Sequence, residues 1–262
     1  MFAMWTQFGI LLLACVYLGV VGAPFNSEGN LGTDLELNAG FFEGDMDIKY
    51  TPDGKLQPTQ RWPLATVYYK IDKKKFTAHQ EKFIQLGMWN IEMVSCITFE
   101  PAPKEIRDYL LITDSKTGCS STVGYSKHNT TVKLVPNSIG KGCFSLGTIQ
   151  HELLHTLGFF HQHNYADRDD YVKIVKDNIS TGKLVNFQKY AADSLGNFGA
   201  PYDYESIMHY PSNAFTKNGG ETIIARQPDG QSKMGQRDGL SSADVTRLNN
   251  MYNCPMLKPE IN

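Results

Sequence analysis

The residues with the clearest chemical potential lie in one short stretch, residues 151–161, with the sequence H-E-L-L-H-T-L-G-F-F-H. Two histidines four positions apart on a helix differ by about 40° around its axis, so His151 and His155 leave the same face and can share one metal ion. His161 could reach that ion only if the helix stopped, and Gly158 can adopt the positive φ that turns the chain back. Three imidazole ligands and an open fourth position are typical of a catalytic zinc site.

Glu152 supplies the group that such a site needs for hydrolysis. Neutral imidazoles leave zinc a strong Lewis acid, which lowers the pKa of bound water to ~7, and a carboxylate beside the first ligand can take the proton. The alternative is an amphipathic helix with unrelated histidines. The pattern H-E-x-x-H should arise by chance on the order of once in a hundred such sequences, and the added requirement for Gly158 and His161 makes it much rarer. The pattern therefore favours a metal site.

The remaining elements must form the core that positions this helix. A Thr77-x-x-Gln80 capping box predicts a helix with Ile84, Met88 and Ile91 on one face, and Ser241-x-x-Asp244 predicts a last helix with Val245, Leu248 and Tyr252 along one side. Strand-like runs occur at 66–71, 97–100, 109–113 and 132–135. After the histidine helix the chain is rich in Pro, Gly and Asn turns, so we expect mostly irregular structure there.

The N-terminal residues indicate that the protein is secreted. Residues 8–21 form an apolar run that is too short for a comfortable membrane span and ends in small residues, so we predict a signal peptide at 1–23 and a secreted protein without a membrane anchor. Residues 24–52 are acidic and glycine-rich without a sustained period, which predicts an extended leader, followed by a globular domain at 53–262. The chain has 262 residues, 41% of them hydrophobic, and its net charge of −2 gives no electrostatic case for binding nucleic acid.

Cysteines and glycosylation sequons fit the same compartment. Removal of the signal peptide would leave Cys96, Cys119, Cys143 and Cys254, an even number that favours two disulfides in any of three connectivities. Sequons begin at Asn129 and Asn178, although such triplets also occur by chance.

The 151–161 motif followed by Asp167-Arg168-Asp169, together with the S-I-M-H-Y run at 206–210, resembles the astacin family of zinc metalloendopeptidases within the metzincins. The likeness covers about residues 61–255 and includes the M-G-Q-R run at 234–237 and the closing Cys254-Pro255. Compact insect members that end at such a Cys-Pro, some of them seminal-fluid enzymes, look most similar. The resemblance implies an α+β fold. Its N-terminal subdomain would hold a mixed β-sheet and the zinc helix, its C-terminal subdomain would be irregular with a terminal helix, and a cleft would separate the two.

The resemblance also implies roles for individual residues. His151, His155 and His161 would bind one zinc ion per chain, Glu152 would be the general base, and Tyr210 would be a fifth ligand that swings away to stabilise the oxyanion. Met208 would pack beneath the zinc without binding it, and His209 would be structural. The family pairing would join Cys96 to Cys254 and Cys119 to Cys143. The F-E-G-D run at 42–45 matches the family's prosegment motif, which makes Asp45 a zinc ligand of the zymogen. Arg237 occupies a position that binds an acidic substrate side chain in some relatives, or it is an exposed arginine without such a role.

Three departures from the family pattern limit this transfer. Gln162 replaces a glutamate that pairs with the mature amino terminus, Ser120 and Thr122 replace aromatic residues at the cleft rim, and no dibasic cleavage signal occurs near 50–55. None of these departures involves a residue assigned to zinc binding or to catalysis. We therefore expect a secreted zymogen that hydrolyses protein or peptide substrates after an activating protease, or self-cleavage, removes the leader. The alternatives are a secreted zinc-containing binding protein without turnover and, less compatible with the Gly158 turn, a zinc amidase.

Overall fold

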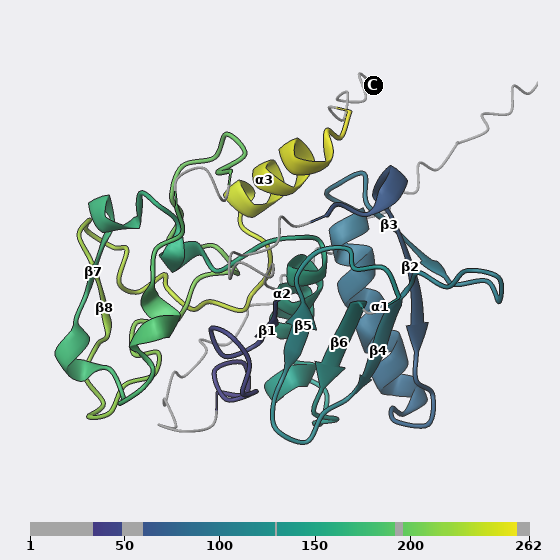
Figure 1. The fold of residues 1–262 in the computed structure, drawn as a ribbon, viewed down its shortest axis with the longest axis horizontal. Coiled ribbons are helices and arrows are strands. Elements are labelled where there is room, and N and C mark those ends of the chain that lie inside the picture. The colour runs from purple at the N-terminus through teal and green to yellow at the C-terminus, as the bar shows by residue number, and fades with distance from the viewer. Residues whose placement is uncertain (1–33, 49–59, 129, 192–195, 256–262) are drawn as a thin grey trace, which may run out of the picture. The chain divides into compact units, whose positions relative to one another are not determined.

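The computed structural model describes residues 34–48, 60–128, 130–191 and 196–255 (Figure 1). The predicted signal peptide at 1–23 lies outside these residues, and so do Asn129 and the expected boundary near residue 52. Residues 31–262 form one compact unit. In the described parts of the chain, no helix is long and apolar enough to cross a membrane.

A mixed six-stranded sheet forms the larger part of this unit, with strand order β1-β5-β6-β4-β2-β3. Its strands are β1 (Met46–Asp47), β2 (Thr66–Ile71), β3 (Thr98–Pro101), β4 (Leu110–Asp114), β5 (Ser120–Thr122) and β6 (Thr130–Leu134). Strand β5 runs antiparallel to β6, whereas the other pairs are parallel, including β1 with β5. The four predicted strands are confirmed to within two residues at each end, but β1 and β5 were not predicted.

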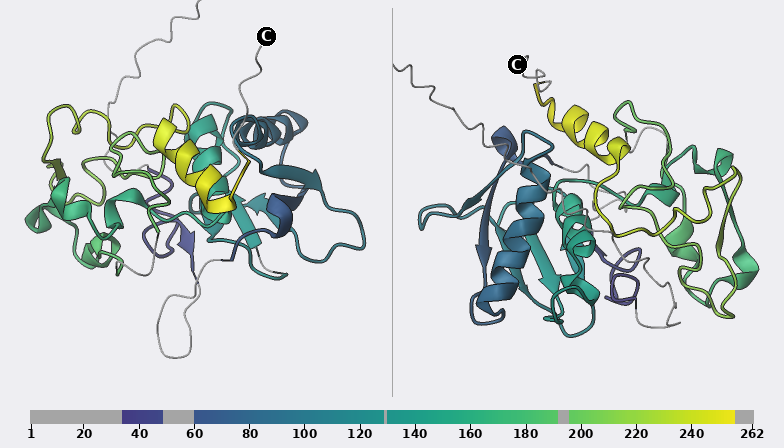
Figure 2. Two further views of the ribbon diagram at one scale, coloured as in Figure 1. Left: turned by 90° about the horizontal axis from the view of Figure 1, so that it is seen from above. Right: turned by 180° about the vertical axis from the view of Figure 1, so that it is seen from behind.

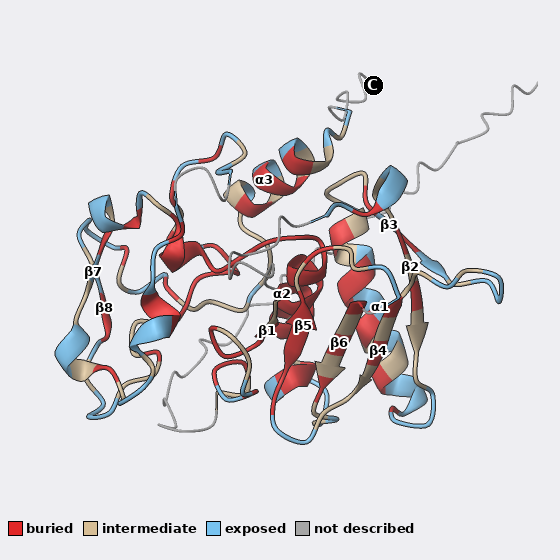
Figure 3. Cartoon of the chain, in the orientation of Figure 1, coloured by how far each residue is buried: buried red, intermediate tan, exposed pale blue. Residues whose placement is uncertain are grey.

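Two helices pack together against the sheet, as the right-hand view of Figure 2 shows. Helix α1 (Ala78–Glu92) begins at the predicted capping box, in which Thr77 and Gln80 exchange hydrogen bonds. Helix α2 (Leu146–Thr156) carries the zinc motif, and Ser145 caps it by accepting from the backbone N–H of Thr148. Figure 3 shows the difference in burial: α1 keeps an exposed face, whereas α2 is buried all round. Because α2 lies inside the core, its side chains are held in fixed positions.

The chain after α2 is mostly irregular, as expected. It contains a two-stranded antiparallel sheet, β7 (Val172–Ile174) with β8 (Ile223–Ala225), and helix α3 (Ser242–Tyr252). The described 3₁₀ turns are short: Pro63–Ala65, Gly142–Phe144, Gln162–Asn164, Arg168–Asp170, Lys176–Asn178 and Leu184–Phe187. A second apolar cluster, which includes Val172, Ile179, Phe187, Tyr210 and Ile223, supports this part.

Helix α3 begins at the predicted Ser241 capping box but buries a different face from the one expected. Leu248 is buried as predicted, whereas Val245 and Tyr252 are only half-buried, and the polar residues Asp244 and Arg247 are buried instead. Hydrophobic periodicity could not reveal this face because half of it is charged.

Two disulfides join distant parts of the chain. They pair Cys96 with Cys254 and Cys119 with Cys143, which is the pairing that the family resemblance implied. The first connects the end of α3 to the segment that follows α1, and the second connects the start of β5 to the turn before α2. Both therefore restrain elements that contact the zinc motif.

Candidate zinc active site

Helix α2 and the turn that ends it bring three histidines together. His151 and His155 lie one helical turn apart, and Gly158 follows the helix with φ of 106°. The N–H of Gly158 donates to the His155 carbonyl and the N–H of Phe159 donates to that of Leu154, which is the hydrogen-bond pattern of a Schellman cap. This turn reverses the chain and places His161 opposite the helix face.

A fourth side chain, Asp45 of the leader, completes the group. Potential ligand atoms of Asp45, His151, His155 and His161 all lie within 4.8 Å of one another, and all four side chains are buried. Asp45 Oδ2 is 3.1 Å from His151 Nε2, and Asp45 Oδ1 is 3.4 Å from His161 Nε2. The structure thus gathers the three predicted histidine ligands and the predicted leader ligand at one point.

The outward nitrogen of each histidine ring is held by an oxygen atom. The Nδ1 atoms lie 2.8 Å from Ile207 O, Phe159 O and Glu43 Oε2 for His151, His155 and His161 respectively. These contacts fix the tautomers and direct each Nε2 inward, as in most metal-binding histidines.

The inward atoms fit a bound cation. Among the described residues, His161 Nε2 and Asp45 Oδ1 are buried without a hydrogen-bond partner, which would be costly unless a cation used them. Three imidazole nitrogens and one carboxylate oxygen are a suitable donor set for tetrahedral zinc.

Glu152 lies beside this group and is fully buried. Its Oε2 accepts a hydrogen bond from Ser121 Oγ on β5, whereas its Oε1 has no hydrogen-bond partner in the described part of the chain. Burial raises the pKa of Glu152 well above its ordinary value, and the charges of Asp45 and Glu36 raise it further. Ser121 was not predicted to be functional, although it lies between Ser120 and Thr122, the two residues that the sequence analysis placed at the cleft rim.

Tyr210 approaches the group from the 206–210 turn. Its hydroxyl donates to the backbone carbonyl of Glu43, and its ring stacks on His163 with 3.8 Å between centroids. Burial raises the pKa of Tyr210 well above its usual value, so the phenol is protonated. Met208 is buried in the main core, and its carbonyl accepts from the Gln162 N–H at 2.9 Å.

The leader makes two further charged contacts that the sequence did not predict. Glu43, two positions before Asp45 in the F-E-G-D run, contacts both His161 Nδ1 and the Tyr190 hydroxyl through its carboxylate. Glu36 forms a bidentate pair with Arg237, with Nε at 3.0 and 3.1 Å from the two carboxylate oxygens. Burial, the largest single cause, would raise the pKa of Glu36, but the charges of Arg237 and His151 and the hydrogen bonds from Arg237 together outweigh it and lower the pKa to about 2. The only sequence signal for these pairs was the acidic composition of the leader, which does not identify the partners.

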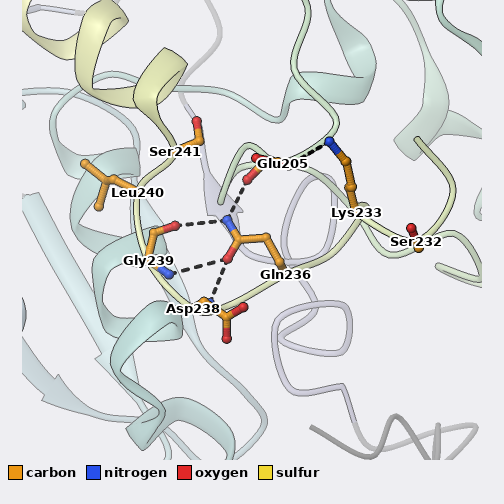
Figure 4. Close-up of a pocket in the computed structure, with 8 residues that line it drawn as sticks. All are labelled: Glu205, Ser232, Lys233, Gln236, Asp238, Gly239, Leu240 and Ser241. Atoms are coloured by element: carbon orange, nitrogen blue, oxygen red, sulfur yellow. Dashed lines mark hydrogen bonds and ion pairs between the residues drawn. The ribbon is translucent and has the colours of Figure 1, made fainter. Parts of the chain in front are cut away.

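Arg237 is positioned by the loop that carries it. Figure 4 shows the neighbouring Gln236 side chain, whose Nε2 donates to Glu205 O at 2.5 Å and to Gly239 O at 2.9 Å. A Cβ atom on Gly147, in the first turn of α2, would collide with the backbone carbonyl of Arg237, so the loop backbone packs directly against the zinc helix. Arg237 is therefore a half-buried residue of the site and not an exposed cation.

The other predicted residues lie apart from the zinc group or outside the described chain. Asn178 is half-buried, and its Nδ2, the atom that a glycan would occupy, donates to Glu221 O at 2.7 Å. Ser120 and Thr122 are buried in β5, the strand that pairs with β1 of the leader. His209 is buried and bonded to the Tyr202 hydroxyl at 2.7 Å, in agreement with a structural role.

Comparison with known proteins settles the family. The family model described as Astacin, a family of peptidases, matches residues 54–253. The chain belongs to the astacin family. Seminal metalloprotease 1 of Drosophila melanogaster, an insect protein as the resemblance led us to expect, is 39% identical over 227 residues, which cover 85% of this chain and 90% of that protein.

Two further astacin comparisons extend this result. Meprin A subunit alpha of Mus musculus is 36% identical over 228 residues, or 87% of this chain, but the match spans only 29% of that longer protein. Among solved structures, high choriolytic enzyme 1, a hatching enzyme zinc-protease from Oryzias latipes, superposes with a TM-score of 0.65 and 34% identity, covering 75% of this chain and 94% of that chain. The chain is therefore an α+β metzincin and a zinc metalloendopeptidase that acts on protein or peptide substrates.

Proposed function

We propose that this astacin is made as a secreted zymogen in which the leader blocks the zinc site through Asp45. The observation that carries the proposal is the position of the Asp45 carboxylate, within 4.8 Å of the ligand atoms of all three histidines. A carboxylate there occupies the fourth position that a water needs for catalysis. Two disulfides support secretion, because such bonds persist in oxidising compartments.

Leader removal frees the groups that perform hydrolysis. A bound zinc ion supplies a Lewis acid that polarises the scissile carbonyl and lowers the pKa of water. Glu152 takes the proton of the attacking water through Oε1, its oxygen without a partner among the described residues, while Ser121 holds Oε2. Glu152 then returns this proton to the leaving amine. Departure of the Glu43 carbonyl frees the Tyr210 hydroxyl, which donates to the carbonyl oxygen as negative charge develops there.

The site also supports a preference for an acidic side chain immediately after the scissile bond. Arg237 lies beside the zinc helix and presents a guanidinium that holds a carboxylate bidentately, here that of Glu36. This geometry suits a substrate Asp or Glu equally well. In the zymogen the leader side chain occupies the place of the substrate carboxylate.

The decisive experiment replaces the proposed base. Glu152→Ala should abolish cleavage of casein or gelatin while zinc remains bound, because all three imidazoles are intact. The unmodified enzyme, inhibited by 1,10-phenanthroline, is the positive control for zinc dependence. More than a small percentage of activity in a zinc-replete variant would disprove the role of Glu152. Absence of peptide cleavage by the unmodified, leaderless protein would favour a zinc-containing binding protein.

A further inference from the structure

Helix α3 contributes a buried carboxylate to the turn that lies against the zinc group. Asp244 is 3% exposed and accepts three hydrogen bonds. One comes from the N–H of Ser241 at 3.1 Å and completes the capping box of the helix. The other two come from outside the helix, from Ser206 Oγ at 2.6 Å and from the Ile207 N–H at 2.8 Å.

Capping does not account for the charge at this position. The capping box of α1 places the neutral side chain of Gln80 where α3 has Asp244, and both boxes make the same pair of hydrogen bonds. A buried carboxylate is costly unless several donors surround it. The extra hydrogen-bond donors at Asp244 belong to the 206–207 turn, and the guanidinium of Arg247 in the same helix lies 3.7 Å from Asp244 Oδ1. The carboxylate therefore serves that turn as well as the helix.

The turn connects directly to a histidine of the zinc group. Ile207, whose N–H is bound by Asp244, uses its carbonyl to hold His151 Nδ1 at 2.8 Å. Ser206 Oγ, which donates to Asp244, also accepts from the Met208 N–H at 3.1 Å. The carboxylate therefore fixes both residues that precede Met208, and with them the oxygen that orients the His151 ring.

We propose that Asp244 is a positioning residue for the zinc site, which holds the Ile207 carbonyl where it fixes the tautomer and orientation of His151. Groups that bond directly to a metal-bound histidine typically contribute about 10- to 100-fold to metal affinity, and Asp244 holds such a group, the Ile207 carbonyl, in place. Through Asp244, helix α3, tethered to the N-terminal half by the Cys96–Cys254 disulfide, becomes part of the zinc site. This inference rests on the proposed assignment of His151 as a ligand.

The test measures zinc affinity and stability separately in the full-length chain. Asp244→Asn keeps the size of the side chain but removes its charge and replaces one acceptor oxygen with a donor, so the bond to Ser206 Oγ is either reversed in direction or lost. We expect zinc affinity, measured by competition with a chromogenic chelator, to fall by about 10- to 100-fold. Ser241→Ala is the matched control, because it weakens the cap of the same helix without removing either bond to the turn. Its zinc affinity should remain within about twofold of the unmodified chain, even if the melting temperature of its zinc-free form falls as much as that of Asp244→Asn.

The inference is overturned if Asp244→Asn binds zinc within about threefold of the unmodified chain, or if Ser241→Ala loses as much affinity as Asp244→Asn. His151→Ala separates these results from failure of the ligand assignment, since it must lose zinc in the same assay. Retention of zinc by His151→Ala would refute that assignment and the inference with it. If Asp244→Asn does not fold, Ser206→Ala takes its place, because it deletes one bond to Asp244 from the turn side. Unchanged zinc affinity in that variant would also refute the inference.

Discussion

The pair between Glu36 and Arg237 gives a quantitative prediction about latency. Glu36→Gln removes the charge of the leader side chain but keeps an oxygen that can accept a hydrogen bond. The pKa of Glu36 falls from its ordinary 4.5 to about 2 in the docked leader, which corresponds to about 3 kcal/mol of docking free energy. The side chains of Arg237 and Glu36 are 18% and 6% exposed, so solvent screening is small. Removing one partner of a buried ion pair typically costs about 3–5 kcal/mol, a comparable value.

The assay is inhibition of the leaderless enzyme by a synthetic peptide of residues 34–48. At 25 °C, about 3 kcal/mol corresponds to a roughly 100-fold increase in the inhibition constant for the Glu36→Gln peptide. Asp47→Asn in the same peptide is the control, because it removes an equal charge from the opposite end. A double-mutant cycle with Arg237→Gln in the enzyme isolates the pair from other effects.

The pH of the assay follows from the direction of the pKa changes. Docking lowers the pKa of Glu36, so its contribution is complete above about pH 4.5 and is lost as the pH falls from there towards 2. Burial raises the pKa of the neighbouring Asp34 to about 6, with the Glu36 charge adding to the effect. Measurements between pH 7 and 8 therefore keep both carboxyls ionised. If the Glu36→Gln peptide inhibits within about threefold of the unmodified peptide, or no worse than the Asp47→Asn peptide, the pair does not anchor the leader.

Three further predictions concern the same region. Asp45→Ala in the full-length chain should give activity before cleavage, or faster self-cleavage; a variant as silent as the unmodified precursor would mean that other leader contacts block the site. Arg237→Ala should abolish an enrichment of Asp or Glu after the scissile bond in peptide-library profiling, and an unmodified enzyme without that enrichment would contradict the specificity proposal. Gln162 is buried and uncharged, so activity should tolerate mature amino termini one or two residues longer or shorter, whereas Gln162→Glu should make kcat/KM and melting temperature sensitive to that end. A sharp loss of activity on adding a single residue to the Gln162 protein would show that the amide already requires a defined terminus.

Local sequence signals predicted the features that depend on neighbouring residues. The capping boxes at Thr77 and Ser241 located the starts of α1 and α3 because their hydrogen bonds form within one turn. The spacing from His151 to Gly158 predicted the helix and its turn for the same reason. Each of these patterns lies within about ten residues of sequence.

Features that depend on distant partners could not be predicted in this way. Glu36 contacts a residue 201 positions away, and Glu43 contacts Tyr190 across 147 positions. Strand β5 has only three residues, and its burial depends on the leader strand that pairs with it. The sequence alone predicts only a helix-capping role for Asp244. Its hydrogen bonds to the 206–207 turn span 37 and 38 positions and leave no local pattern. Composition and periodicity contain no information about such pairings.

The contact between Glu43 and His161 couples docking of the leader to binding of the metal. The leader supplies Asp45 to the metal position and also holds the outward nitrogen of the third histidine. Because coupling between two bound partners is symmetric, a leader that strengthens metal binding must itself be held more tightly when metal is present. The precursor should therefore keep its zinc against chelators that strip the mature enzyme, and a precursor deprived of metal should release its leader more readily to proteases. Zinc binding and protection of the leader from premature cleavage are thus coupled, because each stabilises the other.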